Sequence, residues 1–261
     1  MIEGFDLTGR AALVTGGGTG IGKEVARLLA QRGADVMLVA RRADRLEAAA
    51  REIAEETGRR VASLSCDVTD ADAATAMVQE AADRLGRLDV LINNAGMSSF
   101  SALSKMAPEL WDKDVRLNLN AAFYVSHAAI AHLKAHGNGA VVNVSSLAGI
   151  NGTVGCGAYS AAKAGLQMFT RVAAAEWGPA GVRVNCVAPG MIATELAKRG
   201  WAKVGFDATD ACKVFPLRRP GTPLEVAQAI AFLASDAASY NTGETLTVGG
   251  GPQLKGMIDA D

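Results

Sequence analysis

The chain has 261 residues, of which 49% are hydrophobic and 20% are charged, and its formal net charge is −1. This composition predicts a globular protein with a well-buried core and excludes an intrinsically disordered chain. Because lysines and arginines form no long run, we do not expect nucleic acid to be a partner.

Export and membrane insertion are not expected either. The opening segment MIEGFDLTGR carries two acids and no apolar core, so it does not resemble a signal peptide, and no apolar stretch reaches the roughly 18 residues needed to span a bilayer. The four cysteines lack CxxC spacing, and the three histidines, within 127–136, have no Glu or Cys beside them. We therefore expect a cytoplasmic protein with reduced thiols, no membrane contact and no metal.

Short β-branched runs alternate with longer, Ala-rich amphipathic runs along the chain. The expected strands are 10–15, 34–40, 60–65, 88–93, 139–145, 182–188 and 244–249. The expected helices are 20–32, 43–57, 71–85, 108–135, 158–177 and 223–235. Nearly continuous apolar strands alternating with helices are typical of a parallel sheet covered on both faces. With no linker or repeat, the sequence predicts an α/β fold: one Rossmann-type, doubly wound domain over 1–261.

The first strand ends in the glycine-rich sequence TGGGTGIG, which runs directly into a helix. Its glycines are spaced Gly16-xxx-Gly20-x-Gly22 rather than GxGxxG. Glycine lets a backbone turn sharply and approach a pyrophosphate, whose charge is stabilised at the helix N-terminus. The turn therefore predicts a dinucleotide site. Its expected contacts are Thr15, Gly16, Gly18, Thr19, Gly20, Ile21 and Gly22.

The end of the second strand indicates which dinucleotide binds. Proteins that hold NAD usually place an acid here, hydrogen-bonded to the ribose 2′-hydroxyl. This chain has Ala40 in that place, followed by Arg41 and Arg42. The alternative is that both arginines are simply solvated at the start of a helix. Because no carboxylate repels a 2′-phosphate and guanidinium groups match phosphate geometry, we expect NADP(H) to be favoured over NAD(H).

The segment AYSAAKAGL, residues 158–166, places Tyr159 and Lys163 four residues apart among small residues. Residues with this spacing share a helix face, so the phenol and the ammonium point into one space. Taken alone, the pair is more typical of a lysine that covers a half-buried tyrosine than of a catalytic site.

Together and in this order, these motifs resemble the short-chain dehydrogenase/reductase family over essentially the whole chain. The resemblance is to its single-domain branch of about 250 residues, which includes 3-oxoacyl reductases and alcohol dehydrogenases. The family motif TGxxxGxG matches 15–22, NNAG is intact at 93–96 and PGxIxT matches 189–194. Gly249 departs from the family, which commonly has Asp there, and this departure bears on C-terminal contacts. The resemblance adds as cofactor contacts Asp67, Val68, Asn94, Ala95, Gly96, Pro189, Gly190, Ile192 and Thr194, together with Tyr159 and Lys163.

The resemblance also implies a catalytic set of Asn118, Ser146, Tyr159 and Lys163. Asn118 is chosen over Asn120 in RLNLNAAF, and Ser146 is the second serine of NVSSLAG. Tyr159 is then the general acid/base, its pKa lowered from about 10 by the ammonium and by an oxidised nicotinamide. Ser146 binds the substrate oxygen, Lys163 holds the nicotinamide ribose, and Asn118 supports a water that relays protons.

The residues expected near the substrate are mainly apolar, which favours an aliphatic or alicyclic ketone or alcohol. They are Ser146, Leu147, Ala148, Asn151, Val154, Cys156, Met191, Leu196, Trp201 and Phe206. The segment 191–215, expected to be irregular from residue 195 on, resembles the family's substrate lid. Its cations Lys198, Arg199 and Lys203 are either solvated or contact the phosphates of an acyl carrier, which leaves an acyl thioester as an alternative substrate.

Three functions are compared. The first is an NADP(H)-dependent oxidoreductase that interconverts a ketone and a secondary alcohol by hydride transfer. The second is an enoyl- or dienoyl-CoA reductase, because TGGGTGIG and GGPQL also resemble that branch. The third is a non-catalytic dinucleotide-binding protein, which would be expected to have lost the Tyr or the Lys. A sugar-nucleotide epimerase is disfavoured, since no substrate domain follows the sixth strand.

A homotetramer is the expected assembly. In the family, the helices matching 108–135 and 158–177 pack against the same helices of a second subunit, and 223–249 resembles the second interface. Two different two-fold contacts generate D₂ symmetry. A dimer is the alternative. The positions expected to face the partner are Ala129, Ala164, Leu166, Phe169 and Val172.

Overall fold

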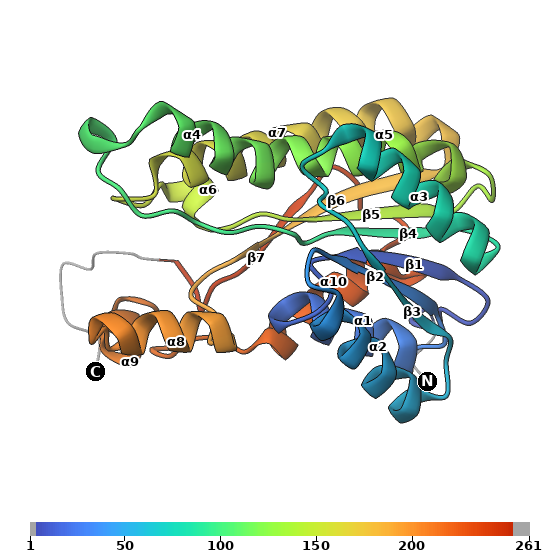
Figure 1. Ribbon diagram of the computed structural model, residues 1–261, viewed down its shortest axis with the longest axis horizontal. Helices are drawn as coiled ribbons and strands as arrows, with labels where there is room; N and C mark the ends of the chain where they lie inside the picture. Colours follow the sequence, from blue (N-terminus) through green and yellow to red (C-terminus); the bar gives the residue numbers. More distant parts are fainter. Residues whose placement is uncertain (1–3, 253–261) are drawn as a thin grey trace.

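The expected strands form one parallel sheet in the computed structural model, which describes residues 4–252 (Figure 1). They are β1 (Ala11–Thr15), β2 (Asp35–Ala40), β3 (Val61–Ser65), β4 (Val90–Asn93), β5 (Gly139–Val144), β6 (Val182–Pro189) and β7 (Thr245–Val248). Their order in the sheet is β3-β2-β1-β4-β5-β6-β7. The direction of winding reverses between β1 and β4, and ligands bind at the carboxyl ends of strands at such a point.

Between and after the strands, the described part of the chain forms helices. They are α1 (Gly20–Gln31), α2 (Ala43–Thr57), α3 (Ala71–Leu85), α4 (Pro108–Val115), α5 (Ala121–Lys134), α6 (Ala148–Asn151), α7 (Gly157–Trp177), α8 (Glu195–Val204), α9 (Ala208–Ala211) and α10 (Pro223–Ala234). Figure 1 shows α3, α4, α5 and α7 on one face and α1, α2 and α10 on the other. The sequence prediction of a doubly wound Rossmann-type sheet is thus confirmed.

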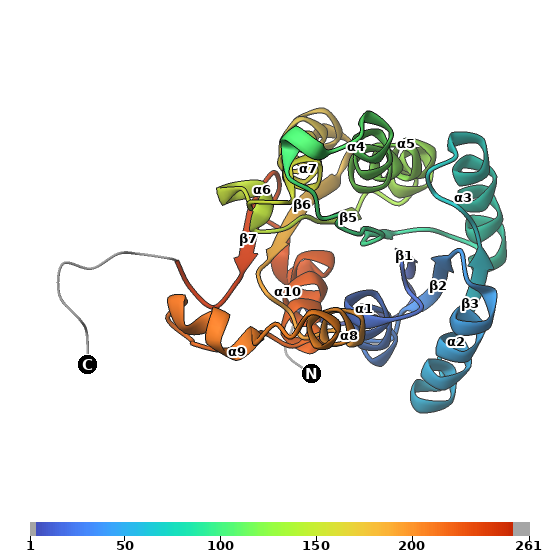
Figure 2. The same cartoon turned by 60° about the vertical axis from the view of Figure 1, so that its left-hand side comes forward.

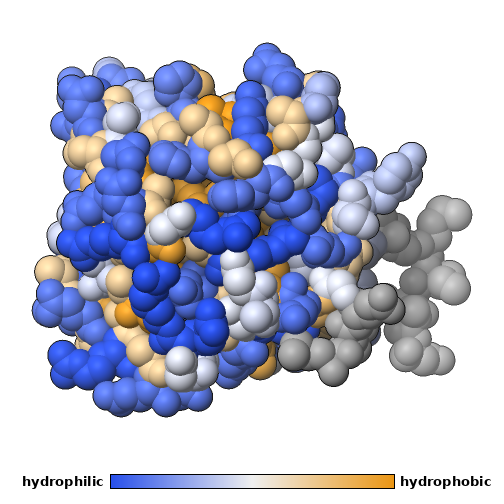
Figure 3. Space-filling view, turned by 90° about the vertical axis from the view of Figure 1, so that its right-hand side faces the viewer, coloured by the Kyte–Doolittle hydropathy of each residue, from blue (hydrophilic) through white to orange (hydrophobic). Residues whose placement is uncertain are grey.

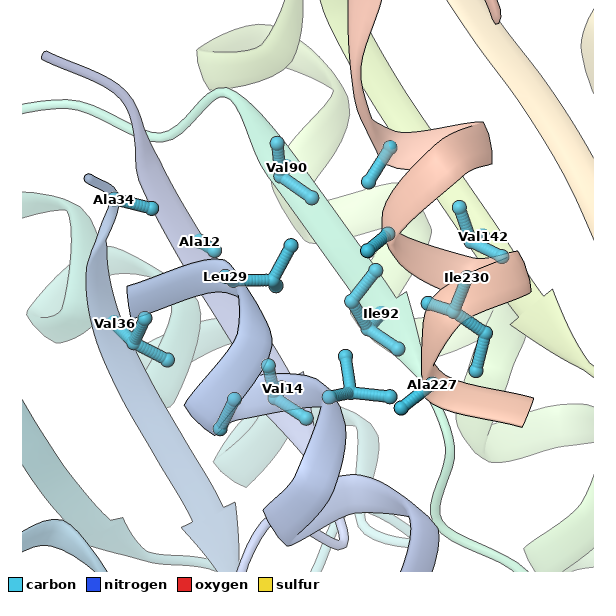
Figure 4. Close-up of a cluster of buried hydrophobic side chains, with 14 of the residues drawn as sticks. Ala12, Val14, Leu29, Ala34, Val36, Val90, Ile92, Val142, Ala227 and Ile230 are labelled. Atoms are coloured by element: carbon cyan, nitrogen blue, oxygen red, sulfur yellow. The ribbon is translucent and has the colours of Figure 1, made fainter. Parts of the chain in front are cut away.

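Successive side chains of each strand point to opposite faces of the sheet, and each face carries a hydrophobic core of its own. In β1, Ala12 and Val14 pack with α1 and α10, whereas Ala11 and Leu13 pack on the opposite face with α3 and α5. Figure 4 shows the first core, where Val14 and Ile92 meet Leu29. Because successive strand side chains point to opposite faces, a fully apolar strand serves both layers.

The long helix expected over 108–135 contains an unexpected feature. Between α4 and α5 lies a π-helical turn, η2 (Arg116–Asn120), which contains the buried Asn118. A π turn widens the helix by one residue and is frequent at functional sites. The hydrophobic pattern of the segment gives no signal of it.

The expectation of irregular structure from residue 195 on is wrong. The segment forms α8, α9 and a short 3₁₀ turn, η4 (Cys212–Val214). The Thr194 hydroxyl caps α8 by accepting a hydrogen bond from the N–H of Ala197, 3.1 Å away. The sequence does carry a signal of α8, because Ala197, Trp201 and Val204 are spaced i, i+4 and i+7 as on one face of a helix. No residue of α8 is buried, so this apolar face lies at the surface. Figures 1 and 2 show α8 and α9 outside the main layers, on the side of α1 and α10.

Two of the five positions expected to face a second subunit face the chain's own core instead. Ala129 and Leu166 are buried, with 0% and 1% of their surface exposed. Both side chains point inward because they lie on the faces of α5 and α7 that pack against the rest of the subunit. Ala164 and Val172 are exposed, and Phe169 is half-buried.

One face of the described part is largely polar. Figure 3, which faces the side where α3 lies in Figure 1, shows hydrophilic side chains over most of that face. Between residues 4 and 252, no helix has the length and apolarity needed to cross a membrane. In the same range, no group of three or more His, Cys, Asp or Glu residues is arranged to hold a metal. All four cysteines lie in this part and are free thiols.

Candidate active site

A cleft of about 1000 Å³ opens at the carboxyl ends of the strands. The glycine-rich turn after β1 forms one end of it, and Tyr159 and Lys163 of α7 lie further along. The loop after β4 and the start of α8 form the walls of this cleft. Residues from distant parts of the sequence therefore share a single space.

The turn after β1 has the geometry of a phosphate cradle. Gly16 and Gly20 have φ values of 67° and 58°, which only glycine adopts without strain. A Cβ atom on Gly22 would lie 2.4 Å from the Gly16 carbonyl oxygen. The first turn of α1 contains no acid, and the Thr19 side chain caps none of its N–H groups. These N–H groups can therefore bind an anion.

Two of the predicted cradle residues support the turn without lining the cleft. The Thr15 hydroxyl is buried and accepts hydrogen bonds from the N–H groups of Asn94 (3.0 Å) and Ala95 (3.1 Å). Gly22 is buried behind Gly16. The other predicted residues of the turn line the cleft: Gly16, Gly18, Thr19, Gly20 and Ile21.

Three arginines lie where β2 ends. Arg41 and Arg42 line the cleft, and Arg45 of α2 joins them. Sequence reasoning missed Arg45, although it lies one helical turn after the pair. Asp67 lies 4.0 Å from the Arg41 guanidinium. Burial alone would raise the pKa of Asp67, but hydrogen bonds from Thr69 and the charge of Arg41 lower it overall.

The NNAG segment connects the two ends of the cleft. The Asn94 amide donates to the carbonyl oxygens of Thr15 (3.0 Å) and Gly16 (3.3 Å), which fixes the glycine turn. A Cβ on Gly96 would lie 2.7 Å from Asn118 Oδ1 and 3.2 Å from Lys163 Nζ. Gly96 therefore lets the chain pass close to both side chains.

Lys163 is buried with only 3% of its surface exposed. Its Nζ donates a hydrogen bond to the Val144 carbonyl oxygen at 2.7 Å and lies 5.7 Å from the centre of the Tyr159 ring. Burial disfavours the charged form and lowers the pKa of Lys163 to about 8. The ammonium thus titrates close to physiological pH.

Burial raises the pKa of Tyr159, and the hydroxyl of Ser146 offsets this in part. Cys156 and Asp114 add smaller contributions that raise it further. The lowered pKa expected from the sequence included the positive charge of an oxidised nicotinamide. For the protein's own groups, desolvation of the phenolate outweighs the hydrogen bond with Ser146.

Asn118 uses its side chain to hold the backbone. Its Oδ1 accepts from the N–H of Met97 (3.1 Å), and its Nδ2 donates to the carbonyl oxygens of Met97 (2.8 Å) and Asp114 (2.9 Å). The side chain is 1% exposed and does not line the cleft.

The expected substrate residues divide into two groups. Those that line the cleft are Ser146, Met191, Leu196 and Trp201. Those that do not are Leu147, Ala148, Asn151, Val154, Cys156 and Phe206. Val154 projects fully into solvent. Cys156 is buried just before α7, where it forms a β-bridge with Ser101. Predicted cofactor residues that also line the cleft are Asp67, Val68, Asn94, Ala95, Gly96, Pro189, Gly190, Ile192 and Thr194.

Sequence reasoning missed one wall of the substrate end. Met97 and Phe100, in the loop after NNAG, line the cleft together with Leu117 of the π-helical turn. The apolar residues of this loop show neither helical nor strand periodicity. Only the position of the loop, directly after the fourth strand, could have indicated that it borders the cleft.

Comparisons with known proteins agree with this arrangement. Residues 16–253 match the family model described as Enoyl-(Acyl carrier protein) reductase. Cis-4-hydroxycyclohexanecarboxylate dehydrogenase of Sinomonas cyclohexanicum is 43% identical over 245 residues, covering 93% of this chain and 96% of that protein. The 3-oxoacyl-(acyl-carrier-protein) reductase of Chlamydia trachomatis is 38% identical over 245 residues, covering 94% and 98%.

A solved structure extends the similarity to the fold. L-sorbose reductase from Gluconobacter frateurii, in complex with NADPH and L-sorbose, matches with a TM-score of 0.90 at 32% identity. The match covers 97% of this chain and 99% of that one. Sequence, fold and family model agree, and the chain belongs to the short-chain dehydrogenase/reductase family of NAD(P)-dependent oxidoreductases.

Proposed function

We propose that the protein interconverts a ketone and a secondary alcohol with NADP(H). The observation that carries this proposal is that the phosphate cradle and the Ser146, Tyr159 and Lys163 side chains line one cleft of about 1000 Å³. A dinucleotide and a small substrate fit together in such a volume. The relatives named as dehydrogenase and 3-oxoacyl reductase support the same chemistry.

The chain's own residues would divide the work as follows. NADPH, when bound, supplies the hydride. Tyr159 donates its phenolic proton to the carbonyl oxygen in reduction and takes it back in oxidation. Ser146 donates a hydrogen bond to the same oxygen. Lys163, with one hydrogen bond to Val144, has donors left to hold ribose hydroxyls. Asn118 fixes the loop that borders the site and is the proposed support of the proton relay.

The preference for NADP(H) rests on charge at the end of β2. Arg41, Arg42 and Arg45 line the cleft there, and Ala40 leaves no acid to repel a 2′-phosphate. The structural relative that was solved with NADPH supports the proposal.

Enoyl reduction is the second candidate, because the matching family model carries that description. The Ser146–Tyr159–Lys163 arrangement favours carbonyl reduction, since its hydroxyl groups are suited to stabilise an oxyanion at the substrate. The two reactions act on different bonds, so a choice of substrates separates them.

A substrate panel tests the proposal. The compounds are cis-4-hydroxycyclohexanecarboxylate with oxidised cofactor, and L-sorbose, acetoacetyl-CoA and crotonyl-CoA with reduced cofactor. Absorbance of the reduced cofactor is followed with NADP(H) and NAD(H) in parallel. Turnover of an alcohol or a ketone, faster with NADP(H), supports the proposal; turnover of crotonyl-CoA alone would establish the second candidate.

We also propose that 191–215 forms a lid and that the protein is a homotetramer. The apolar side chains of Leu196 and Phe206, 71% and 42% exposed, support a lid that closes over an apolar substrate. For assembly, Met168 and Val172 of α7 and Phe123 of α5 leave about half of their surfaces exposed. Light scattering should return four times the chain mass, and an active monomer would contradict the tetramer.

A further inference from the structure

The loop that forms the missed wall of the cleft is anchored at every second residue. Met97 exchanges two hydrogen bonds with the Asn118 side chain. Ser99 donates its N–H to Asp114 Oδ2 at 3.1 Å and its hydroxyl to Oδ1 at 2.8 Å. Ser101 donates its N–H to the Gly155 carbonyl oxygen at 2.8 Å. Phe100, between two anchors, is 81% exposed and lines the cleft.

The spacing of these anchors follows from backbone geometry. Asp114 and Asn118 lie four residues apart on a helix, which is a rise of about 6 Å. Residues two apart in an extended chain are separated by roughly 6–7 Å. The helix from Asp114 to Asn118 can therefore hold Met97 and Ser99 at the same time.

Asp114 is an unusual residue to find in this place. Its carboxylate is only 3% exposed, and both of its oxygens are used by Ser99. Within residues 4–252, no Lys or Arg forms an ion pair with it. Burying a carboxylate without a cation costs free energy, so an apolar residue would suit packing alone better.

We propose that Asp114 is a positioning residue of the active site, which anchors the loop 97–101 against α4. The anchor holds Met97 and Phe100 as a wall of the cleft. The part of this inference that concerns Tyr159 rests on the proposed function, whereas the anchoring does not.

The Asp114 carboxylate also contributes to the pKa of Tyr159, together with other groups around the phenol. Lys163 of α7 lies 5.7 Å from its ring centre, and Cys156 lies at the start of the same helix. The Ser146 hydroxyl lowers the pKa of Tyr159, whereas burial, Cys156 and Asp114 raise it. Removal of the Asp114 charge should therefore lower the pKa of Tyr159 and shift its titration toward acid.

Three substitutions separate the anchor from the charge. Asp114→Asn keeps both contacts, because its carbonyl can accept from the Ser99 N–H and its amide can donate to the Ser99 hydroxyl. It removes only the charge. Asp114→Ala removes both the anchor and the charge. Asp112→Asn removes an exposed charge two residues away on α4 and serves as the matched control.

The anchor is tested by amide hydrogen exchange of residues 97–101, which needs no substrate. Asp114→Ala should exchange at least about fivefold faster than the unmodified protein, the effect of one lost hydrogen bond. Asp114→Asn and Asp112→Asn should exchange at the original rate. Unchanged exchange in Asp114→Ala would overturn the anchor.

The charge is tested by phenolate absorbance against pH, taken as the difference between each protein and its Tyr159→Phe counterpart. Asp114→Asn should move the Tyr159 transition toward acid, and Asp112→Asn should leave it in place. A transition that stays in place with Asp114→Asn would refute the electrostatic role. This titration gives its answer even if no compound of the panel is turned over, so its outcome is distinguishable from failure of the proposed function.

Discussion

The two ends of the cleft are built in opposite ways. At the cofactor end, backbone lies against backbone, and a Cβ on Gly22 would come within 2.4 Å of a carbonyl oxygen. At the substrate end, Phe100 and Leu196 are largely exposed, and a Cβ on Gly200, further along α8 and outside the cleft lining, would meet nothing within 4 Å. Recognition by the backbone demands tight packing, whereas recognition by side chains leaves room for them to vary. One family can thus keep its cofactor and change its substrate.

Tyr159, where the two ends meet, should give the largest effect. Tyr159→Phe removes the proposed proton donor but keeps the ring, so turnover should fall by at least ~10²-fold while cofactor affinity stays nearly constant. Steady-state kinetics and fluorescence titration with NADPH measure the two quantities. Substantial carbonyl reduction by the variant would show that the proton comes from elsewhere.

A pair of glycine substitutions tests the packing contrast directly. Gly22→Ala places a methyl group against Gly16 and Asn94 and should cost about 3 kcal/mol of stability, with loss of cofactor binding. Gly200→Ala, in an exposed helix with open space around it, should add about 0.5–1 kcal/mol. Urea denaturation measures both. Equal changes in the free energy of unfolding for the two variants would contradict the proposed difference in packing.

The charge at the cofactor end should act on one cofactor only. Arg41→Ala should weaken NADPH binding by ~1.5–3 kcal/mol, the scale of a charge-assisted contact with phosphate, and leave NADH binding nearly unchanged. Arg51→Ala removes an exposed arginine elsewhere on α2 and is the control. Similar affinities of the unmodified protein for NADPH and NADH would contradict the preference.

The buried charge of Lys163 should lower the free energy of unfolding of the protein. Burial lowers its pKa from 10.5 to about 8, a penalty of about 3 kcal/mol for the charged form. Lys163→Met removes this penalty but leaves the Val144 carbonyl oxygen unpaired, at a cost of about 1 kcal/mol. The variant should be inactive yet about 2 kcal/mol more stable at pH 7.

The pH dependence of stability provides the check on Lys163. Between about pH 8 and 10.5 the unfolded chain holds a proton that the folded chain has released, so the contribution of Lys163 to the unfolding free energy rises with pH. Below pH 8 the penalty is fully present. The gain in stability from Lys163→Met should therefore disappear toward pH 10.5, and a gain that is independent of pH would rule out this explanation.

The same contrast explains what the sequence could predict. Helices 43–57 and 71–85 were predicted to the residue, and the strands to within two residues, because buried faces impose a period on the sequence. The cofactor end follows from contiguous motifs, so nearly all of its predicted residues line the cleft. Arg45 was missed because it lies outside any motif.

The substrate end could not be predicted in the same way. Val154 and Cys156 lie close to Tyr159 in the sequence, but solvent and the contact with Ser101 take them out of the cleft. Phe100 enters the cleft through a loop whose course is set by Asp114 and Asn118. Such placements depend on contacts between distant segments, which no local pattern encodes.

Transfer of deuterium from NADPH deuterated on the transferring carbon tests the central claim most directly. The protein is incubated with acetoacetyl-CoA and crotonyl-CoA together, and the products are analysed by nuclear magnetic resonance. Carbonyl reduction predicts deuterium on the carbon that bears the new hydroxyl, with crotonyl-CoA unchanged, and none with Tyr159→Phe. Deuterium in the saturated product of crotonyl-CoA, with acetoacetyl-CoA unchanged, would contradict the account.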